Sequence, residues 1–151
     1  MPKTINSFSG RYRFLSNFYR SPIEYEGIRY PTIEHFYQAQ KSLSVEVRRQ
    51  VAEQPTPGGV KRYGRTIYLR PGWESIKESI MLLGLRLKFT DTPLARLLLN
   101  TGETALIEGN DWGDTYWGVY RGEGLNRLGE LLMQVRQELW DAEKTQQETV
   151  T

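Results

Sequence analysis

An acid, an amide and an amine share one side of a predicted helix early in the chain. Glu34, Gln38 and Lys41 occupy positions i, i+4 and i+7 of the segment 30–41. At about 100° per residue, their side chains fall within roughly 60° of one another. If this face is shielded from water, burial shifts the pKa values of the acid and the amine and suits them to acid–base or nucleophilic chemistry. On an open surface, the same residues are an ion pair worth under about 1 kcal/mol.

Aromatic residues flank this face and favour the shielded arrangement. Tyr30, Phe36 and Tyr37 lie beside it in the sequence, as expected for one wall of a cleft. A lysine that loses its water in such a cleft can act as a nucleophile. His35 is the only histidine and lies about 100° around the helix from Glu34. We interpret it as a structural hydrogen-bonding residue rather than a ligand.

Three further positions each leave two interpretations open. The segment 14–18 contains Asn17 and Phe18 and is either a turn between core aromatics or a ligand contact. Arg65 follows two other basic residues and is either part of a solvated face or a phosphate clamp. Trp73 follows a Pro-Gly pair and is either a hydrophobic anchor or a platform on which a flat base stacks.

The composition of a loop in the C-terminal third of the chain indicates a functional role rather than a packing role. Residues 111–118 include two Trp, two Asp and two Gly, which a core does not require. Glycines and Asn126 then lead into the last predicted helix, whose first amide groups could receive an anion such as phosphate. The chain has neither a GxGxxG nor a GxxxxGK[ST] pattern, which disfavours dinucleotide-binding and P-loop folds.

Length and composition indicate one globular domain. The chain has 151 residues, of which 38% are hydrophobic, so there is room for one core and one cleft. We assign the domain to residues 1–143 and expect the polar tail, residues 144–151, to be disordered. With no cysteine and one histidine, we expect neither a metal nor a cofactor.

Charge and hydropathy limit the classes of ligand and the cellular compartment that we expect. The net charge of +2 arises from 20 basic and 18 acidic residues, a balance compatible with a small anionic ligand but not with tight binding to long nucleic acid. No apolar run reaches the roughly 18 residues of a membrane span, and the N-terminus lacks the apolar stretch of a signal peptide. We therefore expect a cytoplasmic protein that does not bind membranes.

Periodicity and turn signals place these residues on helices packed over a small sheet. Strands are expected at about 5–8, 23–26 and 104–108, and helices at about 33–43, 45–54, 60–65, 73–89, 93–100 and 126–143. Thr32 is the expected N-cap of the helix that carries Glu34.

Eight short blocks follow one another along the chain. They are Phe-Leu-Ser-Asn-Phe (14–18), Tyr-Pro-Thr-Ile-Glu-His (30–35), Gln-Ala-Gln-Lys (38–41), Gly-Arg (64–65), Trp73, Lys-Phe (88–89), Asp-Thr-Tyr-Trp-Gly (114–118) and Gly-Leu-Asn-Arg-Leu-Gly (124–129). From about Phe8 to Arg136, the order of these blocks resembles the NADAR or YbiA-like superfamily. The resemblance implies an α+β, predominantly helical fold: a single compact YbiA-like domain with several helices around a small antiparallel sheet.

The resemblance also implies N-glycosidase activity. The known substrates of the superfamily are phosphorylated aminopyrimidine intermediates of riboflavin synthesis and ADP-ribose attached to guanine in nucleic acids. The partner expected here is therefore a small ribotide or an ADP-ribosylated nucleobase or nucleic acid. The alternative is a module that binds ADP-ribose or a nucleotide without cleaving it, and a third interpretation is a structural or phage-type interaction protein. No feature of the sequence assigns an oligomeric state.

The functional positions of the family carry over to Glu34, Trp73, Asp114 and Trp117, and Lys41 matches its lysine. Asp114 is favoured over Asp111 as the aligned aspartate because Trp-Gly follows at the right spacing. The expected catalytic residues are Glu34, Lys41 and Asp114. The expected substrate-binding residues are Asn17, Phe18, Gln38, Arg65, Trp73, Trp117, Gly118 and Asn126.

These residues also suit the chemistry of N-glycoside cleavage when the family resemblance is set aside. Breaking a ribosyl C–N bond builds positive charge on the sugar, which Glu34 or Asp114 could stabilise. Lys41 could alternatively attack the anomeric carbon and form a transient imine. Only an enzyme, and not a binding module, requires perturbed protonation of Glu34 and Lys41.

Overall fold

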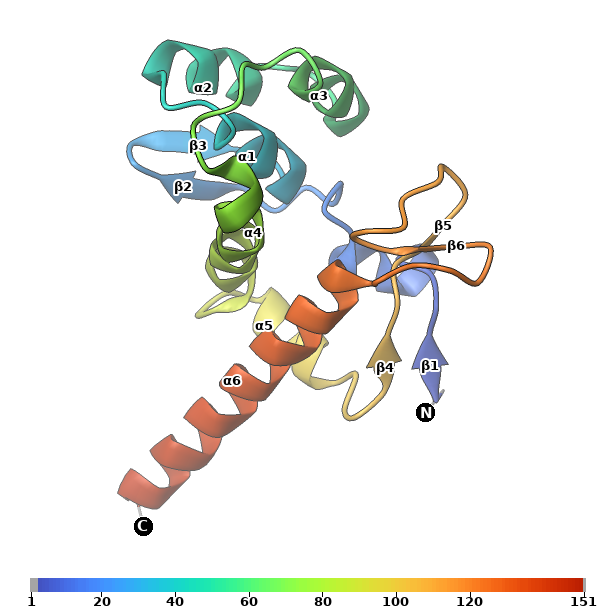
Figure 1. The fold of residues 1–151 in the computed structure, drawn as a ribbon. Coiled ribbons are helices and arrows are strands. Elements are labelled where there is room, and N and C mark those ends of the chain that lie inside the picture. The colour runs from blue at the N-terminus through green and yellow to red at the C-terminus, as the bar shows by residue number, and fades with distance from the viewer. Residues whose placement is uncertain (1–2, 151) are drawn as a thin grey trace. The chain divides into compact units, whose positions relative to one another are not determined.

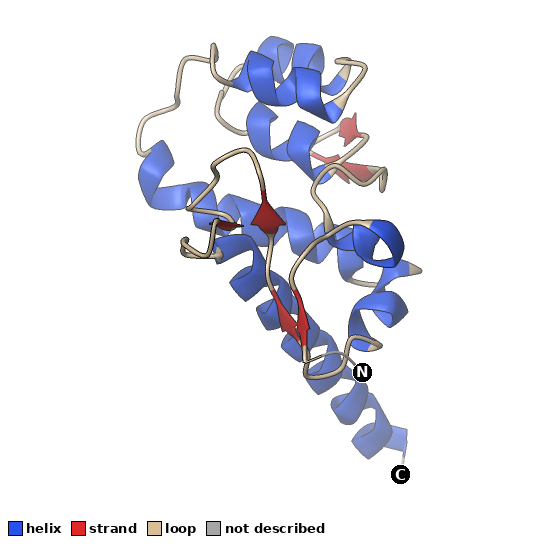
Figure 2. Ribbon diagram, turned by 90° about the vertical axis from the view of Figure 1, so that its right-hand side faces the viewer, coloured by secondary structure: helices blue, strands red, loops and turns tan. Residues whose placement is uncertain are grey.

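The computed structural model describes residues 3–150 and divides into two units, each described by itself (Figure 1). The central unit comprises residues 17–88, and the flanking unit comprises residues 1–16 and 89–151. Figure 2 shows that helices dominate and that the strands are short. The predicted α+β, predominantly helical fold class is confirmed.

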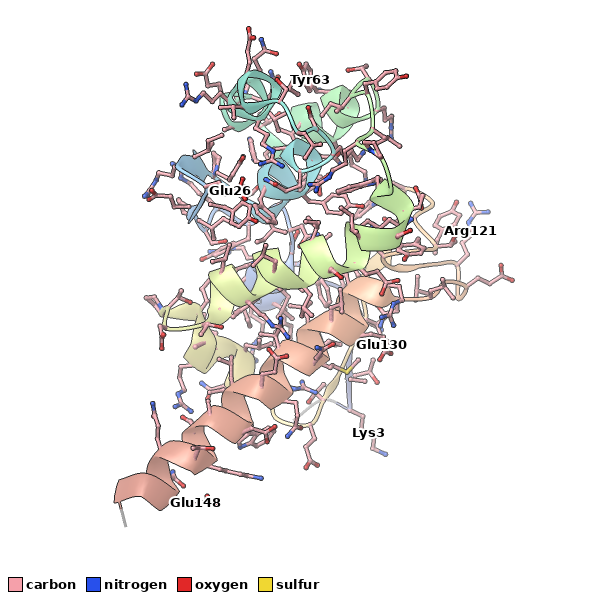
Figure 3. The ribbon with its side chains drawn as sticks, turned by 60° about the vertical axis from the view of Figure 1, so that its left-hand side comes forward. Lys3, Glu26, Tyr63, Arg121, Glu130 and Glu148 are labelled. Carbon is pink, nitrogen blue, oxygen red and sulfur yellow. The ribbon has the colours of Figure 1, made fainter. Side chains whose placement is uncertain are left out.

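The central unit begins with a β-hairpin. Strands β2 (Ile23–Tyr25) and β3 (Ile28–Tyr30) pair antiparallel. Glu26 and Gly27 connect them with φ angles of 48° and 80°, and positive φ at both central residues matches the twist of a two-residue hairpin. The carboxylate of Glu26, labelled in Figure 3, accepts a hydrogen bond of 2.9 Å from the Arg48 guanidinium. This ion pair joins the turn to a helix of the same unit.

Three short helices follow the hairpin, and each begins at a hydroxyl N-cap. They are α1 (Ile33–Ala39), α2 (Val45–Ala52) and α3 (Pro57–Gly64). The caps are Thr32, Ser44 and Thr56, whose side chains accept hydrogen bonds from backbone N–H groups of the first turn. The predicted cap at Thr32 is therefore confirmed. α3 starts earlier than the expected residue 60 because Thr56 caps it and Pro57 suits a first helical turn.

Helix α4 (Trp73–Phe89) has the predicted bounds. Gly84 gives Phe36 of α1 room, since a Cβ at Gly84 would lie 2.9 Å from the phenyl ring. The ring of Phe36 also makes edge contacts with Tyr25 and Tyr30 of the hairpin. Aromatic packing thus fixes α1 between the hairpin and α4.

The flanking unit combines both ends of the chain. Its elements are β1 (Thr4–Ile5), the 3₁₀ helix η1 (Gly10–Leu15), α5 (Leu94–Leu99), β4 (Ala105–Leu106), β5 (Gly109–Asn110), β6 (Val119–Tyr120) and α6 (Arg127–Val150). β1 pairs with β4 and β5 pairs with β6, and both pairs are parallel. The expectation of one small antiparallel sheet is corrected: among the described residues there are three two-stranded pairs, and only β2–β3 is antiparallel.

Two helix ends differ from the expected positions. α1 ends at Ala39 rather than near residue 43, because the amides of Lys41 and Ser42 bond to carbonyls three residues back and the chain then leaves the helix. α6 continues to Val150 rather than ending near 143. Its last part has no Gly or Pro to break it and is rich in good helix formers. The domain boundary at residue 143 stays a prediction.

None of the helices among the described residues combines the length and the apolar composition needed to cross a membrane.

Candidate active site

The polar face of α1 lies inside the central unit. Every residue of α1 is buried, and the exposed fractions of Glu34 and Gln38 are only 7% and 6%. The amide Nε2 of Gln38 donates a hydrogen bond of 2.8 Å to the Glu34 carboxylate. The surface ion-pair interpretation of this face is therefore wrong, and the shielded one is correct for Glu34 and Gln38.

Lys41 reaches the site from the turn after α1 rather than from the helix itself. The side chain is half-buried, and its Nζ donates a hydrogen bond of 3.3 Å to the carbonyl of Gly64, the last residue of α3. Burial lowers the pKa of Lys41 from its ordinary value, the Glu34 carboxylate acts to raise it, and the Arg65 guanidinium acts to lower it. The predicted residues Glu34 and Arg65 are thus both close enough to Lys41 to influence its charge.

Gly64 permits this arrangement because it has no side chain. A Cβ at this position would overlap Oε1 and Cδ of the Gln38 amide. The close approach lets α3 present the Gly64 carbonyl to Lys41 while Gln38 bonds to Glu34. Gly64 was not among the expected site residues, although its position beside Arg65 in a family block was the available signal.

Two buried acceptors of the central unit have no hydrogen-bond partner among the described residues. They are Oε1 of Gln38 and Oδ1 of Asn17. Asn17 is tied to the unit by its other groups, since its carbonyl accepts from the Glu34 amide at 3.1 Å and its Nδ2 lies 3.6 Å from Sδ of Met81. A buried acceptor without a donor costs free energy, which a ligand N–H or O–H would recover.

Trp73 and Phe18 occupy different environments. Trp73 is buried, and its ring lies 5.3 Å from the ring of Tyr37, centroid to centroid, with a tilt of 55°. This contact supports the anchor interpretation of Trp73. Phe18 is 42% exposed, so its ring still presents apolar surface.

His35 has the structural role that the sequence indicated. Its Nε2 lies 2.9 Å from the Gln54 carbonyl, which can only accept, so Nε2 carries the proton. Its Nδ1 then accepts from the hydroxyl of Thr32 at 2.7 Å. Burial lowers the pKa of His35, in agreement with a neutral ring whose two nitrogens are both occupied.

The remaining expected site residues belong to the flanking unit. Oδ1 of Asp114 accepts hydrogen bonds from the backbone amides of Tyr116 at 3.0 Å and Trp117 at 2.9 Å. This carboxylate oxygen therefore shapes the loop, while Oδ2 accepts none from a described residue. The Trp117 ring packs edge-on against Tyr116, with centroids 4.9 Å apart. Gly118 is buried, and a Cβ there would overlap Glu108.

Asn126 is built into the flanking unit. It adopts a φ of 53°, its Oδ1 accepts from the Glu108 amide, and its Nδ2 donates to the Leu106 carbonyl, both at 2.9 Å. The amides of Arg127 and Leu128 at the start of α6 bond to loop carbonyls of Tyr116 and Trp117 at 3.0 Å. These two amides are therefore not open to an anion, contrary to the expectation for this helix start.

The structure thus collects the predicted residues into two groups. The central unit holds Asn17, Phe18, Glu34, Gln38, Lys41, Arg65 and Trp73, and the flanking unit holds Asp114, Trp117, Gly118 and Asn126. Among the described residues, no group of three or more His, Cys, Asp or Glu side chains is placed to hold a metal ion. The chemistry available in the central unit is that of a buried carboxylate, a half-buried amine and amide groups.

Comparisons with known proteins show which family and which structure the chain is similar to. The profile of the NADAR domain matches residues 6–140. N-glycosidase YbiA of Escherichia coli is 41% identical over 146 residues, which cover 92% of this chain and 91% of the relative. A riboflavin biosynthesis protein of Vibrio vulnificus is 39% identical over 130 residues, covering 83% of this chain and 35% of the relative. The NMR structure of Escherichia coli YbiA superposes with a TM-score of 0.83 at 41% identity and covers 95% of this chain and 89% of that one.

Proposed function

The chain belongs to the NADAR family, and on this premise we propose that it is an N-glycosidase, which hydrolyses the C–N bond between a base and a phosphorylated ribose. The observation that carries the proposal is the pairing, within one unit, of a buried carboxylate at Glu34 with a half-buried amine at Lys41. The names of the relatives support the reaction class, since one is an N-glycosidase and another a riboflavin biosynthesis protein.

Glu34 supplies negative charge to the reacting sugar. As the C–N bond breaks, the electron pair leaves with the base and positive charge develops on the anomeric carbon. A carboxylate held by Gln38 in a buried position stabilises this charge more strongly than it would in water. The same carboxylate can then take a proton from the attacking water.

Lys41 provides a second route through a covalent intermediate. Neutral Nζ forms a bond to the anomeric carbon as the base departs and is protonated. The ring oxygen then takes a proton from Nζ, the sugar ring opens, and an imine results. Water adds to the imine and releases the sugar and the amine. The lowered pKa of Lys41 increases the share of neutral amine available for this attack.

The other residues of the expected site bind and orient the substrate. Gln38 and Asn17 offer unpartnered buried acceptors to N–H or O–H groups. The Arg65 guanidinium suits the phosphate. The partly exposed ring of Phe18 provides aromatic surface for the base, while the buried Trp73 anchors Tyr37 of α1. In the flanking unit, Asp114, Trp117, Gly118 and Asn126 remain candidates for substrate contact, with Oδ2 of Asp114 as the available catalytic oxygen.

The substrate is a small molecule of nucleotide type. We propose two candidates, a riboflavin-pathway aminopyrimidine ribotide and ADP-ribosylated guanine, because both join a flat base to a phosphorylated ribose through a C–N bond. Incubation of the protein with each, followed by mass spectrometry of free base and free sugar, identifies the substrate. Borohydride added during turnover traps the imine on Lys41 as a stable adduct.

Two variants test the catalytic roles. Glu34→Gln and Lys41→Ala are each expected to lower base release at least about 100-fold while calorimetry still detects substrate binding. Turnover at the unaltered rate in both variants contradicts the assignment. The alternative function, a module that binds ADP-ribose or a nucleotide without cleaving it, predicts binding of both compounds and release of neither base.

A further inference from the structure

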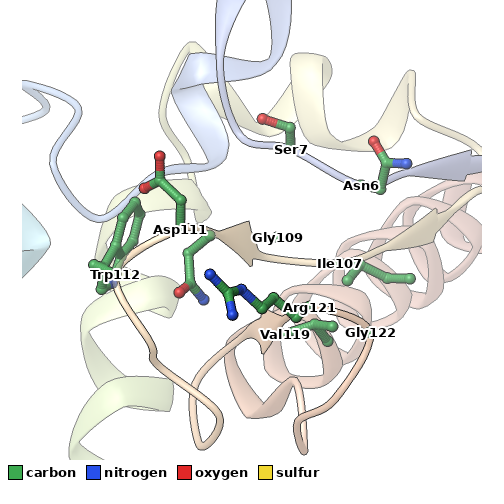
Figure 4. A pocket seen from close by; sticks show the side chains of 10 residues that line it. Asn6, Ser7, Ile107, Gly109, Asp111, Trp112, Val119, Arg121 and Gly122 are labelled. Atoms are coloured by element: carbon green, nitrogen blue, oxygen red, sulfur yellow. The ribbon is translucent and has the colours of Figure 1, made fainter.

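The flanking unit contains a pocket that the proposed reaction does not use. Its volume is about 580 Å³ (Figure 4), within the range of sites for small molecules. Asn6 and Ser7 line one side, and Asp111, Trp112 and Arg121 line the other. The pocket shares no residue with the catalytic set Glu34, Lys41 and Asp114.

The lining of the pocket combines apolar and polar side chains. Ile107 and Val119 are apolar, while other lining residues carry amide, hydroxyl, carboxylate and guanidinium groups. Polar groups placed beside apolar lining fix the orientation of a small ligand. The carboxylate of Asp111 forms no hydrogen bond or ion pair with another described residue.

The loop that carries Asp111 and Trp112 is held in place at its base. The side chain of Asn110 accepts a hydrogen bond of 3.0 Å from the Asp114 amide and donates one of 2.9 Å to the Asp114 carbonyl. The Val119 amide donates to the Glu108 carbonyl at 2.8 Å and joins the two ends of the loop. The site is therefore organised before a ligand arrives, which lowers the entropic cost of binding.

Trp112 offers a large flat surface to a ligand. Trp112 is 56% exposed although it lies on a braced loop. A planar ring that covers the indole removes this apolar area from water and gains stacking energy, and every nucleobase has such a face.

Arg121 supplies the positive charge of the pocket. Its guanidinium carbon lies 5.0 Å from the centroid of the Tyr120 ring, and its backbone has a φ of 50° beside Gly122, at 80°. Figure 4 shows the guanidinium extending into the space between Asp111 and Val119. A guanidinium held by an aromatic ring and presented at a pocket suits a phosphate group.

The charge of the unit disfavours a long polyanion. Residues 1–16 and 89–151 include eight basic and eleven acidic residues, and among the described residues that line the pocket, only Arg121 is basic. Binding of a polynucleotide requires several phosphate contacts, which this pocket does not provide. One phosphate attached to one flat base meets both requirements.

We propose that this pocket is a second ligand site that binds a nucleoside monophosphate, with the base against Trp112 and the phosphate at Arg121. Asp111 accepts a hydrogen bond from an amino group of the base, which favours AMP, GMP and CMP over UMP. The larger stacking area of purines favours AMP and GMP over CMP.

Calorimetric titration of the full chain with AMP, GMP, CMP and UMP tests the site. The expected result is saturable binding of the purine nucleotides that weakens about tenfold or more in Trp112→Ala and is retained in Trp112→Phe. Arg121→Ala is expected to weaken binding of AMP but not of adenosine, because only AMP carries the phosphate. Thermal unfolding of each variant confirms that it is folded.

The same titration separates this site from the catalytic one. In Glu34→Gln, binding at Trp112 is expected to be unaltered. A negative N-glycosidase assay would contradict the proposed activity but not nucleotide binding at Trp112, so each proposal can be contradicted without the other. The second site is contradicted if none of the four nucleotides binds saturably, if Trp112→Ala and Arg121→Ala leave the affinity unaltered, or if Glu34→Gln abolishes the binding.

Discussion

Among single residues, Lys41 has a pKa that its neighbours shift in opposite directions. Burial and Arg65 lower its pKa from the ordinary value of 10.5, and the Glu34 carboxylate raises it. Since only the neutral amine reacts, the acylation rate of Lys41 by an amine-specific reagent is expected to reach half its maximum below pH 10.5. Peptide mass spectrometry across a pH series measures this rate residue by residue.

Two variants should move that midpoint in opposite directions. Glu34→Gln removes the charge that raises the pKa of Lys41 and lowers the midpoint further, whereas Arg65→Gln removes a charge that lowers it and moves the midpoint upward. A midpoint that is the same in all three proteins would show that Lys41 is insulated from both neighbours.

Gly64 is expected to be intolerant of any side chain. Gly64→Ala introduces a Cβ that overlaps the Gln38 amide, so Gln38 must move and its bond to Glu34 is strained or lost. We expect kcat to fall at least about tenfold and the free energy of unfolding to fall by about 1–3 kcal/mol. Steady-state kinetics and urea denaturation measure the two effects.

Gly58 is the matched control, on the same helix. A Cβ there would meet only the Arg62 guanidinium at 3.9 Å. Gly58→Ala should leave kcat unaltered and stabilise the protein by about 0.4–1 kcal/mol through helix propensity and loss of chain entropy. Equal losses of activity at both positions would exclude a specific role for the Gly64 contact.

At the scale of elements, the N-cap of α1 connects stability to the site. The Thr32 hydroxyl accepts a hydrogen bond of 3.2 Å from the His35 amide and donates one to the His35 ring. Thr32→Ala is expected to lower the free energy of unfolding by about 1–2 kcal/mol, and Thr32→Ser to restore most of it. Denaturant titration compares the three proteins. A serine variant as unstable as the alanine variant would contradict capping as the cause.

Local sequence signals predicted the elements more accurately than their ends. Thr32 was predictable as a cap because a hydroxyl before a helical stretch satisfies orphan amides. The end of α1 was not, since no glycine or proline marks it. There, the Arg48 side chain donates a hydrogen bond of 2.8 Å to the Ser42 carbonyl. This side-chain bond from α2 stabilises the departing chain and leaves no trace in the helical periodicity of α1.

At the scale of the whole molecule, the sequence predicted the helical fold class but not the pairing of strands. β1 pairs with β4 across about a hundred residues, and each strand has only two residues. Strands this short have no alternating pattern from which a register could be read. The burial of Glu34 could not be predicted for a similar reason. α1 is shielded partly by the hairpin, whose Tyr25 and Tyr30 contact Phe36 of α1.

Lys88 should make global stability depend on pH. It is 1% exposed, its Nζ lies 5.7 Å from the centroid of the Tyr19 ring, and burial lowers its pKa to about 7. The pKa in the unfolded chain is the ordinary 10.5. Between these values the unfolded chain holds a proton that the folded protein lacks, so the free energy of unfolding rises with pH from about 7 to 10.5 and declines as pH falls toward 7.

The contribution of Lys88 is isolated by Lys88→Met, which keeps the apolar length of the side chain without its charge. The slope of unfolding free energy against pH between 7.5 and 10 is expected to fall by up to about 1.4 kcal/mol per pH unit relative to the unaltered protein. Lys144→Met, at an exposed position of α6, gives the baseline for a surface lysine. Identical slopes in the Lys88 variant and the unaltered protein would mean that Lys88 keeps its proton in the folded protein. The folded and unfolded chains would then bind the same number of protons at this residue, and Lys88 would add nothing to the slope.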